Sequence, residues 1–334
     1  MSQSLKIAIP MAGHGTRMRP HTWSKPKILL PLAGKTVLDH VLDQFSSIPV
    51  HYDIEYVFIV GDQWEQIKDY VNENHTDKNI QFIQQKEMKG QSHALYLAKE
   101  LLKGPMLMAF ADTLIETDLS FLSDEKSDGI AWVKPVPDPR RFGVAVVDEN
   151  EKITRLIEKP KELDNNLAVV GFYYFRSGEA LIDAIEEQMK RNISLKNEYF
   201  LADAINIMLE KYHDFKVQRI ETWLDAGIPE ALLETNTYLL SNGKVDLFDD
   251  PQKDIVIIPP VKIGTNSRLN RCVIGPNVSI GNDCVLENVI LQNSIVDSST
   301  LIRNKIIDNS IIGRNVNIDG IKTKLNIGDN AGVN

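Results

Sequence analysis

Residues 255–334 repeat short aliphatic units at nearly constant spacing, and this repeat limits the possible folds more than any other feature. Aliphatic pairs recur at intervals of 6, 6, 5 and 5 residues, at Val289-Ile290, Ile295-Val296, Leu301-Ile302, Ile306-Ile307 and Ile311-Ile312. Ile-Gly dipeptides recur beside them, starting at Ile263, Ile274, Ile280, Ile312 and Ile327. A period near six, with one inward aliphatic residue per flat strand, is typical of a parallel β-helix with three such units per coil. The pattern predicts a β-helix of about four coils.

The first 240 residues have a different sequence pattern, in which short apolar runs alternate with longer amphipathic stretches. We expect strands over residues 6–11, 54–60, 80–85, 105–112, 129–136 and 168–175, a hairpin over 142–160, and helices over 35–45, 63–74, 92–103 and 177–191. This order predicts a Rossmann-like α/β fold, in which helices cover both faces of a mixed, mostly parallel sheet. The polar stretch 241–254 is interpreted as a linker. The predicted domains are therefore 1–240 and 255–334.

The composition limits the classes of partner that this chain can bind. A net charge of −9 and a pI near 5.4 argue against a nucleic-acid binder, which usually presents a broad basic face. No apolar run approaches the ~18–20 residues of a membrane span, and we see no secretory signal, so we expect a cytoplasmic protein without a membrane partner. Cys272 and Cys284 provide neither a disulfide framework nor a four-ligand zinc set.

Residues 11–27, directly after the first expected strand, concentrate glycines and cations in an otherwise acidic chain. Gly13 and Gly15 permit the positive φ angles and the close backbone approach that a phosphate-binding turn requires. Arg17 adds a bidentate guanidinium and Lys27 a point charge, and both suit phosphate oxygens. The spacing matches neither the P-loop nor the dinucleotide-binding glycine pattern. By themselves these residues predict a phosphate site without identifying its ligand.

The longer string GHGTRMRPHTWSKPK, in which Gly-x-Gly-Thr-Arg is followed ten residues later by a lysine, resembles the sugar-nucleotide pyrophosphorylases. These enzymes are nucleoside-triphosphate:sugar-1-phosphate nucleotidyltransferases. Further blocks resemble the same family in the same order: QQKEMKGQSHALYLAK, FADT, RFGVAVVDE, LIEKP, AVVGFYYF, NEYFLADAI and WLDAGIPEALLETN. The resemblance covers nearly the whole chain. It implies a nucleotidyltransferase domain followed by a short left-handed parallel β-helix of hexapeptide repeats, and it is closest to glucose-1-phosphate thymidylyltransferases.

The resemblance implies a Mg²⁺-dependent attack of a sugar-1-phosphate oxygen on the α-phosphorus of a nucleoside triphosphate, which expels pyrophosphate. Because the nucleophile is already anionic, the chemistry needs cations and metal-binding carboxylates rather than a general base. The implied catalytic residues are Arg17, Lys27, Asp112 and Asp225, of which the two aspartates are the implied metal ligands. The implied nucleotide-binding residues are Ala12, Gly13, Gly15, Thr16, Gln85, Gly90 and Gln91. The implied sugar-phosphate-binding residues are Gly143, Glu158, Lys159 and Val169.

Three residues near the implied site residues in the sequence bear on these assignments. Lys25 competes with Lys27 for the phosphate role, and the alignment of ILLPL favours Lys27. His14 lies inside the loop, but the reaction does not need a base, so we interpret it as loop-exposed. Ala111 precedes the implied metal ligand where the family usually has glycine, which leaves the sugar open.

Several functions remain as alternatives. A pyrimidine edge suits Gln85 and Gly90, which favours dTTP or UTP, and the resemblance of WLDAGIPEALLETN to glucose-1-phosphate thymidylyltransferases favours glucose 1-phosphate. Guanylyl transfer to mannose 1-phosphate is the second choice. A non-catalytic regulatory homologue would be expected to lose Arg17, Lys27 or an aspartate, and this chain retains them. A sugar acyltransferase would share the β-helix, but it typically uses a histidine in the coils, and all seven histidines precede residue 241. We expect the β-helix to support a homo-oligomer.

Overall fold

The structure, a computed structural model, describes residues 3–243 and 254–320. The chain divides into two compact units, which are Met1–Leu30 with Val37–Ile228, and Pro31–Thr36 with Pro229–Asn334. Helix α6 (Pro229–Asn242) and the segment Pro31–Thr36 therefore group with the second unit, whereas the sequence analysis places the boundary at residue 240. Most of the expected linker 241–254 and the last part of the expected β-helix lie outside the described residues. That 1–240 forms a domain by itself stays a prediction.

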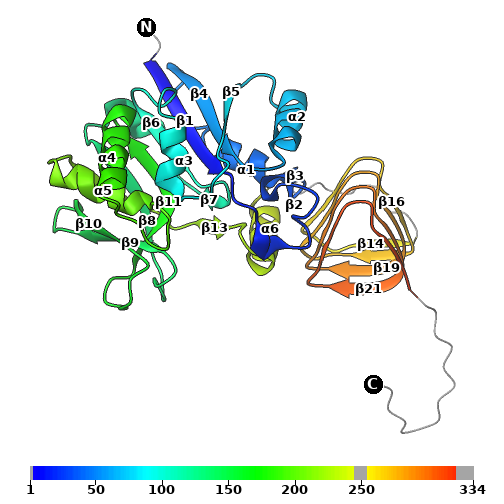
Figure 1. Cartoon of the computed structure of the whole chain (residues 1–334). Helices are drawn as coiled ribbons and strands as arrows, with labels where there is room; N and C mark the ends of the chain where they lie inside the picture. Colours follow the sequence, from blue (N-terminus) through cyan, green and yellow to red (C-terminus); the bar gives the residue numbers. More distant parts are fainter. Residues whose placement is uncertain (1–2, 244–253, 321–334) are drawn as a thin grey trace. The chain divides into compact units, whose positions relative to one another are not determined.

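The first unit is built on a nine-stranded mixed sheet in the order β10-β9-β11-β6-β1-β4-β5, with β8 pairing with β11 and β12 pairing with β8 (Figure 1). The block β6-β1-β4-β5 is parallel, and β11 runs antiparallel to β6. This sheet confirms the expected Rossmann-like α/β fold. Its strands are β1 (Gln3–Met11), β4 (Tyr52–Val60), β5 (Asn79–Gln84), β6 (Met106–Ala109), β8 (Gly129–Pro135), β9 (Gly143–Val147), β10 (Ile153–Glu158), β11 (Leu167–Phe175) and β12 (Phe215–Arg219).

Apolar side chains from helices pack on both faces of this sheet. On one face, α3, α4 and α5 share a hydrophobic core with alternate strand residues such as Ala8 and Met108. On the other face, Phe45, just after α1, stacks on Phe172 with ring centroids 5.7 Å apart. The helices are α1 (Val37–Asp43), α2 (Trp64–Asn74), α3 (Gln91–Leu97), α4 (Gly178–Lys190) and α5 (Leu201–Glu210), with 3-10 turns η1 (Thr16–Met18), η2 (Lys27–Leu29) and η3 (Ser120–Asp124).

The carboxyl ends of the parallel strands bring three distant segments to one edge of the sheet. Strand β1 ends at Met11 just before the glycine loop, β5 ends at Gln84 just before Gln85, and β6 ends at Ala109 shortly before Asp112. Ligands of open parallel sheets bind at this edge, because the loops that leave the strands converge there. A separate two-stranded ribbon, β7 (Thr113–Ile115) with β13 (Trp223–Asp225), continues from the β6 segment.

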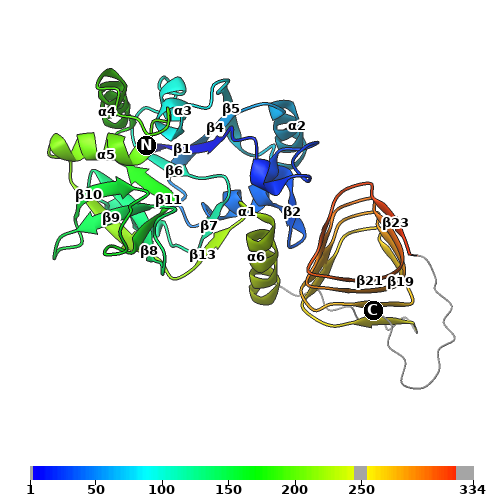
Figure 2. The same ribbon diagram turned by 60° about the horizontal axis from the view of Figure 1, so that its bottom comes forward.

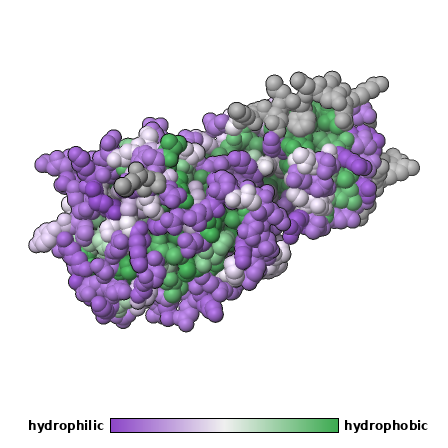
Figure 3. Space-filling view, turned by 90° about the horizontal axis from the view of Figure 1, so that it is seen from above, coloured by the Kyte–Doolittle hydropathy of each residue, from purple (hydrophilic) through white to green (hydrophobic). Residues whose placement is uncertain are grey.

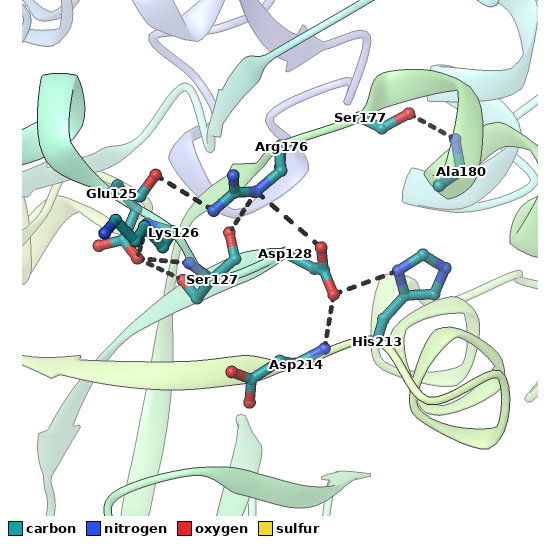
Figure 4. A network of polar contacts seen from close by, with 9 residues as sticks. All are labelled: Glu125, Lys126, Ser127, Asp128, Arg176, Ser177, Ala180, His213 and Asp214. Carbon is teal, nitrogen blue, oxygen red and sulfur yellow. Dashed lines mark hydrogen bonds and ion pairs between the residues drawn. The ribbon is translucent and has the colours of Figure 1, made fainter.

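A polar network closes the opposite edge of the sheet, where β8 and β12 begin and β11 ends (Figure 4). Arg176 donates from Nε to the Ser127 carbonyl at 3.0 Å and from Nη2 to the Glu125 carbonyl at 3.1 Å. Asp128 accepts a hydrogen bond from the Asp214 amide at 2.9 Å. Because each of these bonds joins segments that are distant in sequence, the network holds the three strand ends in register.

The second unit is a parallel β-helix, which Figures 1 and 2 show as stacked triangular coils. Paired side chains on neighbouring coils lie 15 to 17 residues apart, less than three full hexads, which accounts for the five-residue steps in the repeat. The strands are β14 (Ile255–Ile257), β15 (Val261–Ile263), β16 (Arg268–Asn270), β17 (Cys272–Ile274), β18 (Val278–Ile280), β19 (Val285–Gln292), β20 (Ile295–Val296), β21 (Leu301–Asp308), β22 (Ile311–Ile312) and β23 (Asn317–Asp319). Both cysteines are free and buried in its aliphatic core.

Asparagines at the corners of the β-helix form columns of hydrogen bonds from coil to coil. Asn277 donates to Asn293 Oδ1 at 2.9 Å, and Asn293 donates to Asp308 at 3.0 Å. A second column runs from Asn288 through Asn304, with 3.0 Å between Nδ2 and Oδ1. All four asparagines have positive φ angles, which asparagine tolerates better than most residues. The polar residues between the aliphatic pairs therefore form the turns of the coil.

Helix α6 and the short hairpin β2 (Pro31–Leu32) and β3 (Lys35–Thr36) join the β-helix through one buried asparagine. The Oδ1 atom of Asn236 accepts from the Ala33 amide at 3.0 Å and from the Ser279 hydroxyl at 2.7 Å. The helix expected over 35–45 therefore begins only at Val37, because the preceding residues pair as a strand.

Candidate active site

The glycine loop after β1 forms one wall of a cavity of about 560 Å³, a size suited to a small ligand. Gly15, with a φ of 59°, directly precedes η1, and a Cβ there would lie 3.1 Å from Thr22 Cγ2. Thr22 donates to the Gly15 carbonyl at 2.8 Å, which holds the loop in this conformation. Both Lys25 and Lys27 line the cavity, as does the exposed His14, whose Nδ1 is 4.0 Å from an oxygen of Asp62.

Two aspartates and a lysine lie close together beside this cavity, which Lys27 and Asp112 line. Lys27 Nζ forms an ion pair with Asp112 Oδ2. Asp225 reaches the same place because β13 pairs with β7, which puts Asp225 opposite Thr113, and because the Ala226 amide donates to the Asp112 carbonyl at 2.9 Å. Carboxylates that are far apart in the sequence thus become neighbours through a ribbon only three residues long on each side.

Gly227 marks the point where these charged groups converge. A Cβ on Gly227 would lie 2.7 Å from Asp225 Oδ1, 3.2 Å from Asp112 Oδ2 and 3.5 Å from Arg17 Nη2. The Gly227 amide donates to Asp225 Oδ1 at 2.6 Å, so the backbone approach that fixes this carboxylate leaves no space for a side chain.

The electrostatics of the two aspartates differ. Burial raises the pKa of Asp112, but the Lys27 ammonium and the Arg17 guanidinium lower it below its ordinary value. Burial and the neighbouring Asp112 carboxylate raise the pKa of Asp225. Two like charges this close favour a cation between them, and paired carboxylates are ligands that suit Mg²⁺. Within the described ranges no group of three or more His, Cys, Asp or Glu side chains could hold a metal, so further ligands would be substrate oxygens and water.

Gln85, Gly90 and Gln91 line the other side of the same cavity. Gly90 has a φ of 90°, and a Cβ there would lie 2.5 Å from the Tyr199 carbonyl oxygen. The Gln85 side chain donates to the Gly90 carbonyl at 3.2 Å, so the two residues predicted to read the base contact each other directly.

A second cavity of about 480 Å³ is lined by the residues predicted to bind the sugar phosphate, Gly143, Glu158, Lys159 and Val169, together with Asp225. Burial raises the pKa of Glu158, although Lys159 Nζ is 3.6 Å from its carboxylate. Lys159 also lies 4.4 Å from the ring centroid of Phe200.

The two cavities adjoin, because they share lining residues that include Arg17, Gln91 and Asp112. All the residues singled out from the sequence line one cavity or both, although the role of each stays a prediction. Sequence reasoning missed a set of lining residues in the second cavity, namely Arg141, Phe142, Tyr173, Glu198 and Trp223. All five lie in segments that resemble the family, namely RFGVAVVDE, AVVGFYYF, NEYFLADAI and WLDAGIPEALLETN, and this resemblance was the available signal.

A glycine turn, two cations and two carboxylates at the carboxyl edge of an α/β sheet define a phosphate-handling protein. Residues 8–242 match the nucleotidyl transferase family, and the chain belongs to this family. The match confirms the resemblance to sugar-nucleotide pyrophosphorylases and the transferase class.

Several known proteins are similar to this chain. The bifunctional protein GlmU of Methanocaldococcus jannaschii is 34% identical over 247 residues, which cover 74% of this chain and 57% of that protein. The UTP–glucose-1-phosphate uridylyltransferase AglF of Haloferax volcanii is 29% identical over 233 residues, covering 68% of this chain and 93% of AglF. The chain thus spans less than two thirds of the GlmU relatives that it matches.

A solved structure supports the fold. A UDP-glucose pyrophosphorylase complexed with UDP-glucose superposes with a TM-score of 0.60 at 22% identity, covering 73% of this chain and all of that chain. No helix in the described part of the chain is long and apolar enough to cross a membrane.

Proposed function

We propose that this chain transfers a nucleotidyl group from a nucleoside triphosphate to a sugar 1-phosphate and releases pyrophosphate. The observation that carries the proposal is that the cavity with the glycine loop and the cavity with Glu158 and Lys159 share Arg17 and Asp112. Two anionic substrates held in these cavities would meet beside a guanidinium and a carboxylate pair.

In this reaction a phosphate oxygen of the sugar phosphate forms a bond to the α-phosphorus, and the bond from that phosphorus to the bridging oxygen of pyrophosphate breaks. Arg17 and Lys27 neutralise the charge that develops on the triphosphate, and the glycine loop supplies backbone amides. Mg²⁺, when bound by Asp112 and Asp225, would supply charge neutralisation and alignment of the phosphates. The partly buried Glu158 would accept hydrogen bonds from sugar hydroxyls.

The test is pyrophosphate release from UTP or dTTP with glucose 1-phosphate, compared between the wild type, Asp225→Asn and Lys27→Ala. We expect each substitution to lower turnover at least a hundredfold, because each removes a charge that acts on the transition state. The matched control is His14→Ala, which changes an exposed residue of the same cavity and is expected to retain turnover. Unchanged turnover in Asp225→Asn or Lys27→Ala would contradict the assigned roles.

For the substrates we propose UTP or dTTP with glucose 1-phosphate, with guanylyl transfer to mannose 1-phosphate as the second candidate. The name of the related AglF, a UTP–glucose-1-phosphate uridylyltransferase, supports a uridylyl donor. A matrix of five nucleoside triphosphates against glucose-, mannose-, galactose- and N-acetylglucosamine-1-phosphate decides the pair. Absence of pyrophosphate release with every pair would favour a regulatory homologue.

We also propose that a second copy of the chain docks on one face of the β-helix. Four outward aliphatic residues, here called the aliphatic ladder, lie in register on successive coils: Val256, Val273, Ile290 and Ile306. Ile306 is 78% exposed, and Val256 54%. On the face drawn in Figure 3, hydrophobic patches lie between hydrophilic areas of the described surface. A flat aliphatic sheet face suits face-to-face packing on an identical face.

Arg271 lies next to the ladder and pairs with Glu287 of the same copy, with 2.7 Å between Nη2 and Oε1, so its charge is already neutralised within one chain. A two-fold axis along the strands would bring two identical ladders face to face. We expect Ile306→Lys to shift the mass in solution toward the protomer, measured by light scattering after gel filtration. Leu163→Lys, at a residue of the first unit that is 55% exposed, is the matched control. A wild type that stays a protomer, or an assembly that survives Ile306→Lys, would refute this interface.

A further inference from the structure

A histidine outside both cavities contacts the amide that is proposed to read the base. Gln85 is 5% exposed, and its Nε2 donates to the Gly90 carbonyl at 3.2 Å and lies 3.1 Å from His93 Nδ1. A carbonyl oxygen can only accept, so the end of the amide that faces Gly90 must be the NH₂ group. The same nitrogen then donates its other hydrogen to His93, whose Nδ1 must be unprotonated.

This arrangement leaves the amide oxygen of Gln85 for the ligand. Within the described chain no hydrogen bond to Gln85 Oε1 is formed, and this atom is not among the buried polar atoms that lack a partner. It is therefore accessible from the cavity that Gln85 lines. An oxygen at this place accepts an N–H group and repels a lone pair.

The surroundings hold both acceptors in place. Gly90 is fixed by its positive φ and by the tight approach of the Tyr199 backbone. His93 belongs to α3 and is partly buried. Burial and the nearby Lys89 ammonium lower the pKa of His93, while Glu87 raises it, and the net decrease favours the neutral ring that Gln85 requires.

We propose that His93 is a positioning residue for base selectivity: by accepting from Gln85 Nε2 it presents Gln85 Oε1 to bases whose pairing edge carries a ring N–H. Uracil, thymine and guanine have such a group, whereas cytosine and adenine present a ring lone pair at that position. The inference rests on the proposed function only in taking a nucleoside triphosphate as the ligand. It assigns His93 no contact with the reacting atoms, because His93 does not line the described cavities.

The test compares His93→Leu with His93→Asn. Both replacements branch at the γ position, but only asparagine places an acceptor oxygen where Nδ1 lies. Calorimetric titration with UTP and with CTP gives the ratio of the two affinities without requiring turnover, and kcat/KM for the same nucleotides gives the second readout. We expect the UTP/CTP affinity ratio to fall about tenfold in His93→Leu, the effect of one lost hydrogen bond to the amide. We expect it to stay within about twofold of wild type in His93→Asn.

If His93 had a purely structural role, its loss would weaken the binding of both nucleotides equally. An unchanged UTP/CTP affinity ratio in His93→Leu would therefore overturn the inference. An equal loss of selectivity in the two variants, or a wild type that binds UTP and CTP equally, would overturn it as well. Selective UTP binding without pyrophosphate release would instead leave this inference standing and refute the proposed reaction.

Discussion

Replacing Glu125 by glutamine provides a test of the polar network at the sheet edge opposite the candidate site. The Glu125 Oε1 atom accepts from the Ser127 amide and hydroxyl, both at 2.7 Å, and Lys216 Nζ lies 2.7 Å from Oε2. Burial raises the pKa of Glu125, but the Lys216 and Ser127 hydrogen bonds outweigh it and lower the pKa to about 2.

The magnitude follows from the difference between the folded and unfolded pKa values. A decrease from 4.5 to about 2 corresponds to about 3 kcal/mol in favour of the folded state. The Lys216 side chain is 41% exposed, so solvent screening reduces the expected effect to about 2 kcal/mol. Because the folded pKa is depressed, this contribution is complete above pH ~4.5 and is lost as the pH falls toward ~2. Glu125→Gln should therefore destabilise the protein at pH 7 by about 2 kcal/mol and at pH 3 by less than half of that.

Urea unfolding monitored by tryptophan fluorescence measures the stability of the first unit, which contains Glu125. All four tryptophans, including the fully buried Trp132, precede residue 229 and therefore lie in the first unit. Lys216→Met should show the same pH dependence as Glu125→Gln, and the double variant should add little, because both singles break one interaction. An equal loss of stability at pH 7 and pH 3 would refute the reasoning, since it would assign the effect to packing and not to the charge.

Three further outcomes are expected. Gly90→Ala should weaken UTP binding at least tenfold by calorimetry, because its methyl group would lie 2.5 Å from the Tyr199 carbonyl oxygen; unchanged affinity would contradict the proposed base pocket. Asn236→Ala should lower the free energy of unfolding of the second unit by about 2–4 kcal/mol in scanning calorimetry, because the Ala33 amide and the Ser279 hydroxyl lose a buried acceptor. Chelation of divalent ions should abolish pyrophosphate release and added Mg²⁺ should restore it, whereas turnover that persists in excess chelator would exclude the proposed metal requirement.

The sequence predicts the long elements of the fold well because their periodicity is strong. The strands around Phe58 and Tyr173 and the β-helix coils were recognisable from continuous apolar runs or from a regular repeat. Helix α3 ends at Leu97, earlier than the expected residue 103, although Leu102 beyond it is still fully buried. A helical pattern of apolar residues therefore persists in a segment whose backbone forms turns.

Prediction of the candidate site from the sequence has a different limit. Arg17, Lys27 and Asp112 were recognisable because short motifs carry them, and these motifs follow strands. No local pattern predicts that three residues ending at Asp225 pair with the strand that begins at Thr113, because pairing across more than a hundred residues depends on the tertiary fold. The aromatic residues of the second cavity were missed for a related reason, since an aromatic side chain in an apolar run is equally suited to a core.

The asparagine columns of the β-helix have a direction. Asn277 donates to Asn293 and Asn293 donates to Asp308, so the amide dipoles align along the stack and meet an anion that has no N–H to continue the column. Spontaneous deamidation at Asn293 would convert this donor into a second carboxylate facing Asp308, at the cost of a hydrogen bond and with like-charge repulsion in its place. The columns thus make the β-helix sensitive to chemical ageing at single positions. Asn293 and Asn304 are the middle members of the two columns, so deamidation at either would interrupt its column.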